Sequence, residues 1–436
     1  AYEEAIEKDP SDPFSWLGRG DAKKAMGQIN ESLRSYDKAG KEWADKGFLN
    51  ESIKAYGKAL NLDPHDAGAW KGIGDAYLSL GNDKGAIQSY DKAADEMAID
   101  GQYNESLKIY NENAERLIKA KQYSDAVLTC DKILAIDPED GKTWSRKGDE
   151  LSVLGRNDES LQAYKNASDH LAVRISENDP PDIAVKAADK AIEIAPEDPE
   201  AWTKKGKALL LLNWYNEAIE AYNNATKFNP EAVEAWQGKG YALYRMGRYD
   251  EAFQAYDKAI EFDPTNVDIW DLKGEGLYWA GRHEESLQAY EEVTKIDPEN
   301  AEAWIMIGDI LLSFNRFNES FDAYMRPYKI NPDPSWASRW MEIGQYLLDY
   351  RLFDKAIQAF NMVLEIDPRS PDALKKKGDA LEGMGRHEEA LSVYNESIGL
   401  NQSSASVWFS IGKALEASSK HDEAIEAYDK AVQIDP

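Results

Sequence analysis

Histidine, cysteine and carboxylate side chains are the groups of this sequence that could bind a metal, act as a nucleophile or transfer a proton. Of the five histidines, His283, His387 and His421 follow a glycine or its substitute by two residues, at one position of a repeat described below. Equivalent residues of stacked repeats stand at least one repeat apart, so these side chains cannot share a metal ion. We therefore predict surface turns at these histidines and no metal site.

Cys130 and the paired carboxylates also fit structural roles better than catalytic ones. Cys130 is the one cysteine and replaces a tyrosine at a packing position, which favours a small buried side chain over a nucleophile. A lone thiol cannot form an internal disulfide and fits a reducing compartment such as the cytoplasm. Pairs such as Glu284 and Glu285 stand where helices start, and acids interact favourably with the helix dipole there. The sequence predicts no enzyme activity, no cofactor and no metal.

Eight Asn-x-Ser/Thr triplets permit two interpretations. They begin at Asn30, Asn50, Asn104, Asn166, Asn224, Asn318, Asn395 and Asn401. They could be glycosylation acceptors of a secreted protein. Alternatively the repeat itself generates them, with the asparagine as a helix cap and the serine as a small packing residue. The positions of Asn30, Asn50, Asn104 and Asn318 favour the second interpretation, and glycosylation stays open.

The elements that would position these residues follow from the repeat. Trp is followed four residues later by Gly at Trp16/Gly20, Trp70/Gly74, Trp144/Gly148, Trp202/Gly206, Trp236/Gly240, Trp270/Gly274, Trp304/Gly308, Trp340/Gly344 and Trp408/Gly412. A tenth copy has Leu374 and Gly378, and from Trp202 to Trp304 the step is 34 residues each time. Each regular copy then carries an aliphatic residue, a small residue, an aromatic residue and a closing proline at constant offsets.

These offsets predict two antiparallel helices in each copy. Trp236, Gly240 and Leu243 share one face of the first helix, and Pro264 ends the second helix. Small residues such as Gly240 and Ala252 let the two helices approach closely. Because a pair this thin cannot cover its own apolar face, the pairs must stack. The expected fold is all-α, with no sheet.

The pattern W-x2-[LIK]-G-x2-[YL], followed by G-x-[YH]-x-[ED]-[AS] and a closing [DN]-P, resembles the tetratricopeptide repeat over essentially the whole chain. The resemblance implies an alpha-alpha superhelix, a right-handed solenoid whose first helices line a concave groove. It also implies a scaffold that binds other proteins.

The first half departs from the regular pattern. The spacings of Pro10, Pro64, Pro138 and Pro196 exceed one repeat by roughly one or two helices with their turns. We infer longer helices near residues 31–46, 84–99, 104–119 and 158–176, each shared by two pairs, and about 25 helices in all. Residues 1–10 are then the second half of a truncated repeat, residues 11–196 an irregular segment with inserted helices, and residues 197–436 a regular array. Pro180 and Pro181 predict a turn that opens a helix.

The resemblance also implies which residues would face a ligand, at fixed positions around the Trp of each first helix. Those positions supply the candidate partner-binding residues Lys207, Leu211, Tyr241, Tyr244, Arg245, Asp271, Glu275, Tyr278, Trp279, Asp309 and Leu312. A stripe of Tyr, Trp and Leu edged with acids suits a protein segment with apolar and basic side chains. Alternatively, Tyr244, Tyr278 and Leu312 pack against neighbouring helices, and the acids only solubilise the surface.

Two ligand types known in the family do not fit this sequence. The clamp for a C-terminal carboxylate uses Lys and Asn, whereas the position five after the Trp here is Asp21, Asp75, Asp149, Asp309 or Asp379. The asparagine ladder of the O-linked N-acetylglucosamine transferases, two residues after each Trp, is missing. We expect neither ligand.

Charge and hydropathy limit the remaining classes of partner. The 436 residues include 51 basic and 80 acidic side chains, a formal charge of −29, which argues against nucleic acid. No apolar run approaches the roughly 20 residues of a membrane span. The sequence therefore predicts a noncatalytic scaffold for protein or peptide partners.

Two alternatives remain open: a homo-oligomer that stacks head to tail through uncapped ends, or the regulatory arm of an enzyme whose catalytic domain lies outside the chain. We expect the chain to be a piece of a longer protein.

Overall fold

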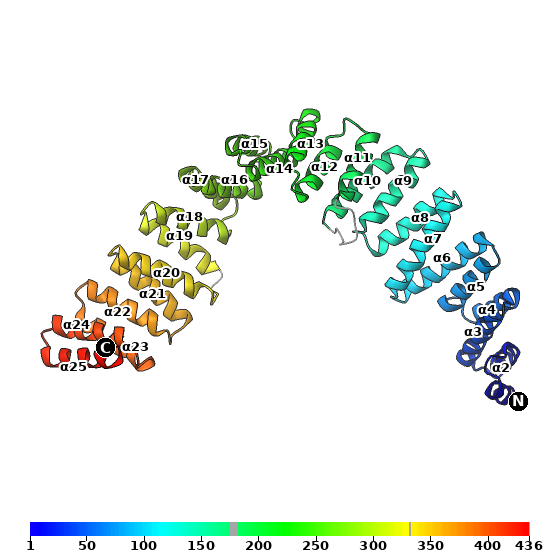
Figure 1. The fold of residues 1–436 in the computed structure, drawn as a ribbon, viewed down its shortest axis with the longest axis horizontal. Helices are drawn as coiled ribbons and strands as arrows, with labels where there is room; N and C mark the ends of the chain where they lie inside the picture. Colours follow the sequence, from blue (N-terminus) through cyan, green and yellow to red (C-terminus); the bar gives the residue numbers. More distant parts are fainter. Residues whose placement is uncertain (174–181, 331–332, 436) are drawn as a thin grey trace. The chain divides into compact units, whose positions relative to one another are not determined.

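The computed structural model describes residues 1–173, 182–330 and 333–435, and over these residues the fold is entirely α-helical (Figure 1). It contains 25 helices in the described part of the chain and no strand there. Both the all-α fold and the expected number of helices are confirmed. The chain divides into two compact units, Ala1–Arg248 and Tyr249–Pro436, which are described separately.

The first unit carries fourteen of the described helices. They are α1 (Tyr2–Lys8), α2 (Pro13–Ala25), α3 (Ile29–Asp45), α4 (Leu49–Leu60), α5 (Ala67–Ser79), α6 (Asp83–Ile99), α7 (Tyr103–Lys119), α8 (Tyr123–Ile136), α9 (Gly141–Val153), α10 (Asn157–Val173), α11 (Ile183–Ile194), α12 (Pro199–Leu211), α13 (Tyr215–Phe228) and α14 (Val233–Arg245).

The second unit carries the other eleven described helices. They are α15 (Tyr249–Phe262), α16 (Val267–Trp279), α17 (His283–Ile296), α18 (Ala301–Ser313), α19 (Phe317–Ile330), α20 (Trp336–Asp349), α21 (Phe353–Ile366), α22 (Pro371–Gly383), α23 (His387–Leu400), α24 (Ala405–Ala417) and α25 (His421–Ile434).

Four long helices replace separate helix pairs in the first unit, as the wide proline spacing predicts. Helices α3, α6, α7 and α10 each have 17 residues, against 12 to 14 in most others. The predicted helix near 158–176 is described as far as Val173. Residues 174–176, and the turn predicted at Pro180 and Pro181, lie outside the described residues.

The repeated residues close each helix pair through three kinds of contact. In seven copies the motif Trp donates its indole N–H to the carbonyl of the proline six residues earlier, as over the 2.8 Å from Trp236 Nε1 to Pro230 O. A serine hydroxyl donates to a backbone carbonyl of the preceding helix, as Ser286 does to Gly274 at 2.7 Å. The motif Gly makes room for the packing aromatic. These contacts confirm the antiparallel pairs.

Side-chain caps lie mainly on first helices and not at the predicted asparagines, although Asn82 caps the second helix α6. In the first helix α12, for example, Asp198 accepts the backbone N–H groups of Glu200 and Ala201. The asparagines of the Asn-x-Ser triplets do not cap: Asn30 is the second residue of α3, whose N-cap Gln28 makes no side-chain bond. The tight turn before these second helices contains a left-handed residue, such as Gly247 at φ 75°, which ends the preceding first helix.

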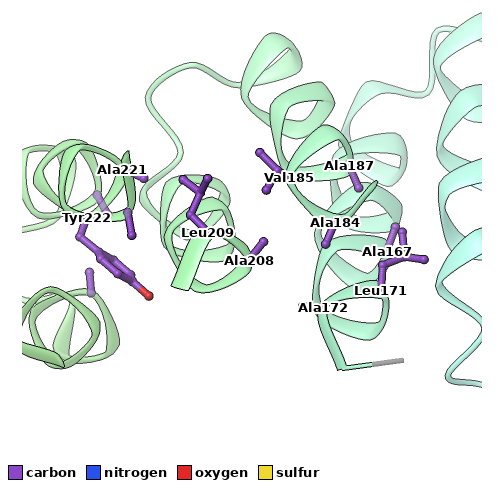
Figure 2. Close-up of a cluster of buried hydrophobic side chains, with 13 residues drawn as sticks. Ala167, Leu171, Ala172, Ala184, Val185, Ala187, Ala208, Leu209, Ala221 and Tyr222 are labelled. Carbon is purple, nitrogen blue, oxygen red and sulfur yellow. The ribbon is translucent and has the colours of Figure 1, made fainter. Parts of the chain in front are cut away.

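The core is a row of clusters between consecutive helices. Figure 2 shows one of them, where side chains of α10 to α14 meet. Its largest member, Tyr222, lies beside alanines and Leu209, and it is almost completely buried. The small residues bring the helix backbones close enough for one aromatic ring to fill the remaining space.

A pair of glycine substitutions tests this close approach. In Gly206→Ala the new Cβ would lie 2.6 to 2.8 Å from carbon atoms of the buried Tyr222 ring. We expect the free energy of unfolding to fall by about 1–3 kcal/mol, because the ring must shift in a filled core. Gly57→Ala, inside α4 with no atom within 4 Å of the new Cβ, should instead raise it by about 0.5–1 kcal/mol. Urea unfolding followed by circular dichroism measures both, and an equal loss in both variants would contradict the packing argument.

Candidate functional site

The predicted partner-binding residues fall on two separate units. Lys207 and Leu211 lie on α12, and Tyr241, Tyr244 and Arg245 lie on α14 of the first unit. The other six lie on α16 and α18 of the second unit, and these are Asp271, Glu275, Tyr278, Trp279, Asp309 and Leu312. Each unit is therefore considered as a surface of its own.

In the first unit most of these side chains contact one another or a neighbouring helix. Lys207 Nζ lies 3.3 Å from Asp169 Oδ1. The guanidinium of Arg245 lies over the rings of Tyr215 and Tyr241, 5.4 and 5.6 Å from their centroids, and donates to the Tyr241 hydroxyl at 2.7 Å. Leu211, by contrast, is 53% exposed. Among these five residues, Leu211 is thus an exposed apolar side chain, and Arg245 and Tyr241 form a stacked group with Tyr215.

Asp309 in the second unit holds helices together. Its carboxylate accepts the hydroxyl of Tyr324 and both oxygens lie 2.7 Å from Arg339 Nη2, so it joins α18, α19 and α20. The same bond from the packing Tyr to the equivalent Asp recurs at Asp21/Tyr36, Asp75/Tyr90, Asp149/Tyr164 and Asp379/Tyr394, the last in the copy with Leu374 in place of the Trp. Sequence reasoning missed this role, although the joint occurrence of the Asp and the Tyr in these copies was the signal for it.

The acids of α16 have no such partner. Asp271 and Glu275 are one helical turn apart, and Asp268 and the α18 residue Glu302 lie near them. Burial raises the pKa of the Asp271 carboxyl, and the charges of Glu302, Glu275 and Asp268 raise it further. Within the described residues no cation forms an ion pair with any of these four side chains. We call Asp268, Asp271, Glu275 and Glu302 the α16 acidic cluster, and its repulsion is not neutralised by the protein.

An aromatic row begins next to this cluster. Trp279 is 67% exposed and meets Tyr278 edge-on, with ring centroids 5.5 Å apart. Tyr278 contacts the His283 ring at 5.1 Å, and His283 contacts Phe314 at 6.5 Å. A hollow of about 260 Å³ lies beside His283 and Phe314. Trp279 therefore has little packing duty, whereas the places of His283, the first residue of α17, and of Phe314, in the turn after α18, were not predicted.

The histidines and Cys130 take up structural positions. His283, His387 and His421 are the first residues of α17, α23 and α25, so the predicted turn position is wrong by one residue. Cys130 is buried, and burial raises the pKa of its thiol to about 12. Among the described residues no group of three or more His, Cys, Asp or Glu side chains could hold a metal ion.

Two larger hollows lie in the first unit, on other helices than the candidate partner-binding residues. One, of about 820 Å³, is formed by α4, α5 and α6, and the other, of about 640 Å³, by α6, α7 and α8. Lys84, Gln88 and Asp91 of α6 line both. The helical spacing of the first half predicted inserted helices there but no hollow.

Comparison with known families now identifies the repeat. A family model described as tetratricopeptide repeat matches residues 176–225, 203–267, 272–333 and 375–436, and one described as TPR repeat matches residues 40–81. The two models together cover more than half of the chain. The chain belongs to the tetratricopeptide repeat family. Proteins of this TPR family are generally noncatalytic scaffolds that bind protein or peptide partners.

Several solved TPR structures are similar in fold. The crystal structure of MamA is 24% identical and covers 37% of this chain and 93% of its own, with a TM-score of 0.30. YrrB, described as a TPR protein with an unusual peptide-binding site, is 20% identical over 54% of this chain and 99% of its own, with a TM-score of 0.30. Yeast Tom70 is 16% identical and covers 93% of this chain and 92% of its own, with a TM-score of 0.32. Scores this low carry no argument about ligands. A comparison with curated proteins gave no match.

The membrane question can be answered for the described residues. None of their helices combines the length and the apolar composition that crossing a membrane requires. The family match makes the chain a TPR scaffold, and its fold is consistent with protein–protein interaction.

Proposed function

We propose that this TPR chain is a noncatalytic scaffold that binds a basic, apolar segment of a partner protein on the α16–α18 surface. The observation that carries the proposal is the α16 acidic cluster beside the exposed ring of Trp279. An unneutralised group of carboxylates next to an exposed aromatic side chain complements a segment in which Lys or Arg adjoins an apolar residue.

The acidic cluster supports the basic half of this proposal. Asp271 is half-buried, so its charged form is already disfavoured by lost solvation and by three neighbouring carboxylates. A bound Lys or Arg would remove that repulsion and stabilise the ionised form. The formal charge of −29 on the whole chain would also speed the approach of a cationic partner.

Trp279 supports the apolar half. It lies one turn from Glu275 on α16, so both side chains belong to the same end of one helical face. Large rigid aromatic side chains contribute most to binding where they can be covered, and Trp279 is 67% exposed with Tyr278 beside it. Leu312 is half-buried and Asp309 is held by Arg339, so we assign these two to shaping the surface.

The residues of the first unit are proposed as a second contact area for the same class of partner. Leu211 supplies an exposed apolar side chain there, and Tyr241, Tyr244 and Arg245 supply polar and aromatic groups. Lys207, held by Asp169, would position the edge of this area.

Two labelled peptides test the α16–α18 surface. One alternates Leu and Lys, the other alternates Leu and Glu, and fluorescence anisotropy measures their binding to the full chain at low and high salt. We expect only the Lys peptide to bind, and more weakly at high salt. Trp279→Ala, and separately the double variant Asp271→Asn with Glu275→Gln, should weaken binding about tenfold or more, since a covered aromatic anchor is typically worth about 2 kcal/mol.

The matched control is Tyr103→Ala, which removes another exposed aromatic side chain from the start of α7 in the first unit. It should bind the Lys peptide as the unchanged protein does. Equal binding of both peptides, or full binding by the Trp279→Ala protein at unchanged stability, would show that this surface is not the site.

A further inference from the structure

The hollow formed by α4, α5 and α6 is open to solvent, with mainly apolar side chains on its α4 and α5 walls and polar ones on α6. Ile53 and Leu60 of α4 and Trp70, Ile73 and Tyr77 of α5 line it, and α6 forms its far wall. Its volume of about 820 Å³ is in the range of pockets that hold ligands or apolar side chains of a partner.

Gly57 widens this hollow. It lies in the middle of α4, lines the hollow, and no atom lies within 4 Å of the Cβ that any other residue would have. Glycine is unfavourable inside a helix, and packing does not require it here. The equivalent residue after the packing tyrosine is Asp37 in α3 and Asp91 in α6. At this position α3 and α6 carry an aspartate side chain, whereas Gly57 of α4 leaves open space.

The charges at the rim differ in sign from those of the chain as a whole. Lys84 and Lys92 of α6 both line the hollow, and within the described residues neither forms an ion pair. The one acid of the lining, Asp91, is held by Lys132 at 2.8 Å, which also binds Asp95. In a protein of formal charge −29, these two lysines beside the apolar α4 and α5 walls can attract acidic side chains of a partner.

We propose that the Gly57 hollow binds an acidic, apolar segment of a partner protein. An aliphatic or aromatic side chain of the segment enters the recess over Trp70 and Ile73, and flanking Asp or Glu side chains pair with Lys84 and Lys92. Gln88, exposed on the ridge between the two hollows, can donate to and accept from the backbone of the segment. This site lies on other helices than the α16–α18 surface and selects the opposite charge.

A selection from displayed random twelve-residue peptides tests the proposal on the full chain. We expect the enriched peptides to combine Asp or Glu with Leu, Ile, Phe or Trp. Gly57→Gln places a side chain into the recess and should lower the affinity of those peptides at least tenfold. The double variant Lys84→Glu with Lys92→Glu should do the same, and Trp279→Ala should not.

Three controls keep the outcome interpretable. Gly57→Ala should fold with unchanged or higher stability, since its methyl group meets open space. Gly399→Gln changes another helical glycine with no atom within 4 Å of its Cβ, in α23 of the second unit, and should leave peptide affinity unchanged. Sedimentation over a range of concentrations shows whether a second copy of the chain competes for the hollow.

Four results would overturn the proposal. The first is that no acidic, apolar peptide is enriched, and the second is that enriched peptides bind the Gly57→Gln protein as well as the unchanged protein. The third is that Gly399→Gln lowers peptide affinity as much as Gly57→Gln does. The fourth is that the chain self-associates and Gly57→Gln abolishes this self-association. Basic peptides whose binding depends on Trp279 bear on the α16–α18 surface alone, so the two sites can fail independently.

Discussion

Trp340→Ala is expected to lower the free energy of unfolding by about 3–5 kcal/mol, the range for removing a large aromatic side chain from a filled core. Trp340 has 0% exposure and packs against Phe321, Tyr324, Tyr328 and Trp336, with ring centroids 5.4 to 6.5 Å apart. The nearby helices cannot collapse into so large a space without separating these contacts.

Trp340→Phe should recover most of this loss. The indole N–H of Trp340 is buried and has no hydrogen-bond partner, unlike that of Trp236, so phenylalanine removes an unsatisfied donor as well as part of the ring. Urea unfolding measures the stabilities, and hydrogen exchange in α19 to α21 locates the opening.

Trp279→Ala is the matched control, because its exposed side chain should contribute less than about 0.5 kcal/mol. A loss below about 1 kcal/mol in Trp340→Ala would contradict the packing.

Asp37→Asn is expected to stabilise the first unit at pH 8 and to have little effect at pH 4. Burial raises the pKa of the Asp37 carboxyl to about 7, and the charge of Asp66 and a hydrogen bond with it add to the effect. Asp37 Oδ1 is buried without a partner, whereas Asp66 accepts the backbone N–H of Ala69 at the start of α5. Asp37 and Asp66 are therefore stable together when they share one proton, and they repel each other when both carboxyls are ionised.

The direction of the pH dependence follows from proton counting. Between the ordinary aspartate pKa of 3.8 and about 7 the folded state holds a proton that the unfolded chain has lost, so stability falls as pH rises through this window. Because Asp37 is only partly buried, we expect the free energy of unfolding to fall by about 1–2 kcal/mol between pH 4 and pH 8, which is less than the full pKa shift would give. Urea unfolding from pH 4 to pH 8 should show this slope in the unchanged protein and not in Asp37→Asn. Asp45→Asn, exposed on the same helix, should keep the slope, and its disappearance there would contradict the assignment.

The α16 part of the candidate site could be predicted because it lies on one helix. Glu275 follows Asp271 by four residues and precedes Tyr278 and Trp279 by three and four, so the helical period alone brings these side chains to one side of α16. The role of Asp309 could not be predicted in this way. Its partners Tyr324 and Arg339 come from two other helices, and only their packing decides whether a carboxylate faces solvent or joins neighbours.

The sequence by itself determined the helical repeat, the four long helices and the place of the motif Trp, Gly and Tyr residues, because each depends on spacing along one or two adjacent helices. Only the tertiary structure decided that Trp340 is buried and Trp279 exposed, which acids form ion pairs, and where Gly57 lines a hollow. Those properties depend on the volume and charge that neighbouring helices bring to a point, and a linear period does not encode them.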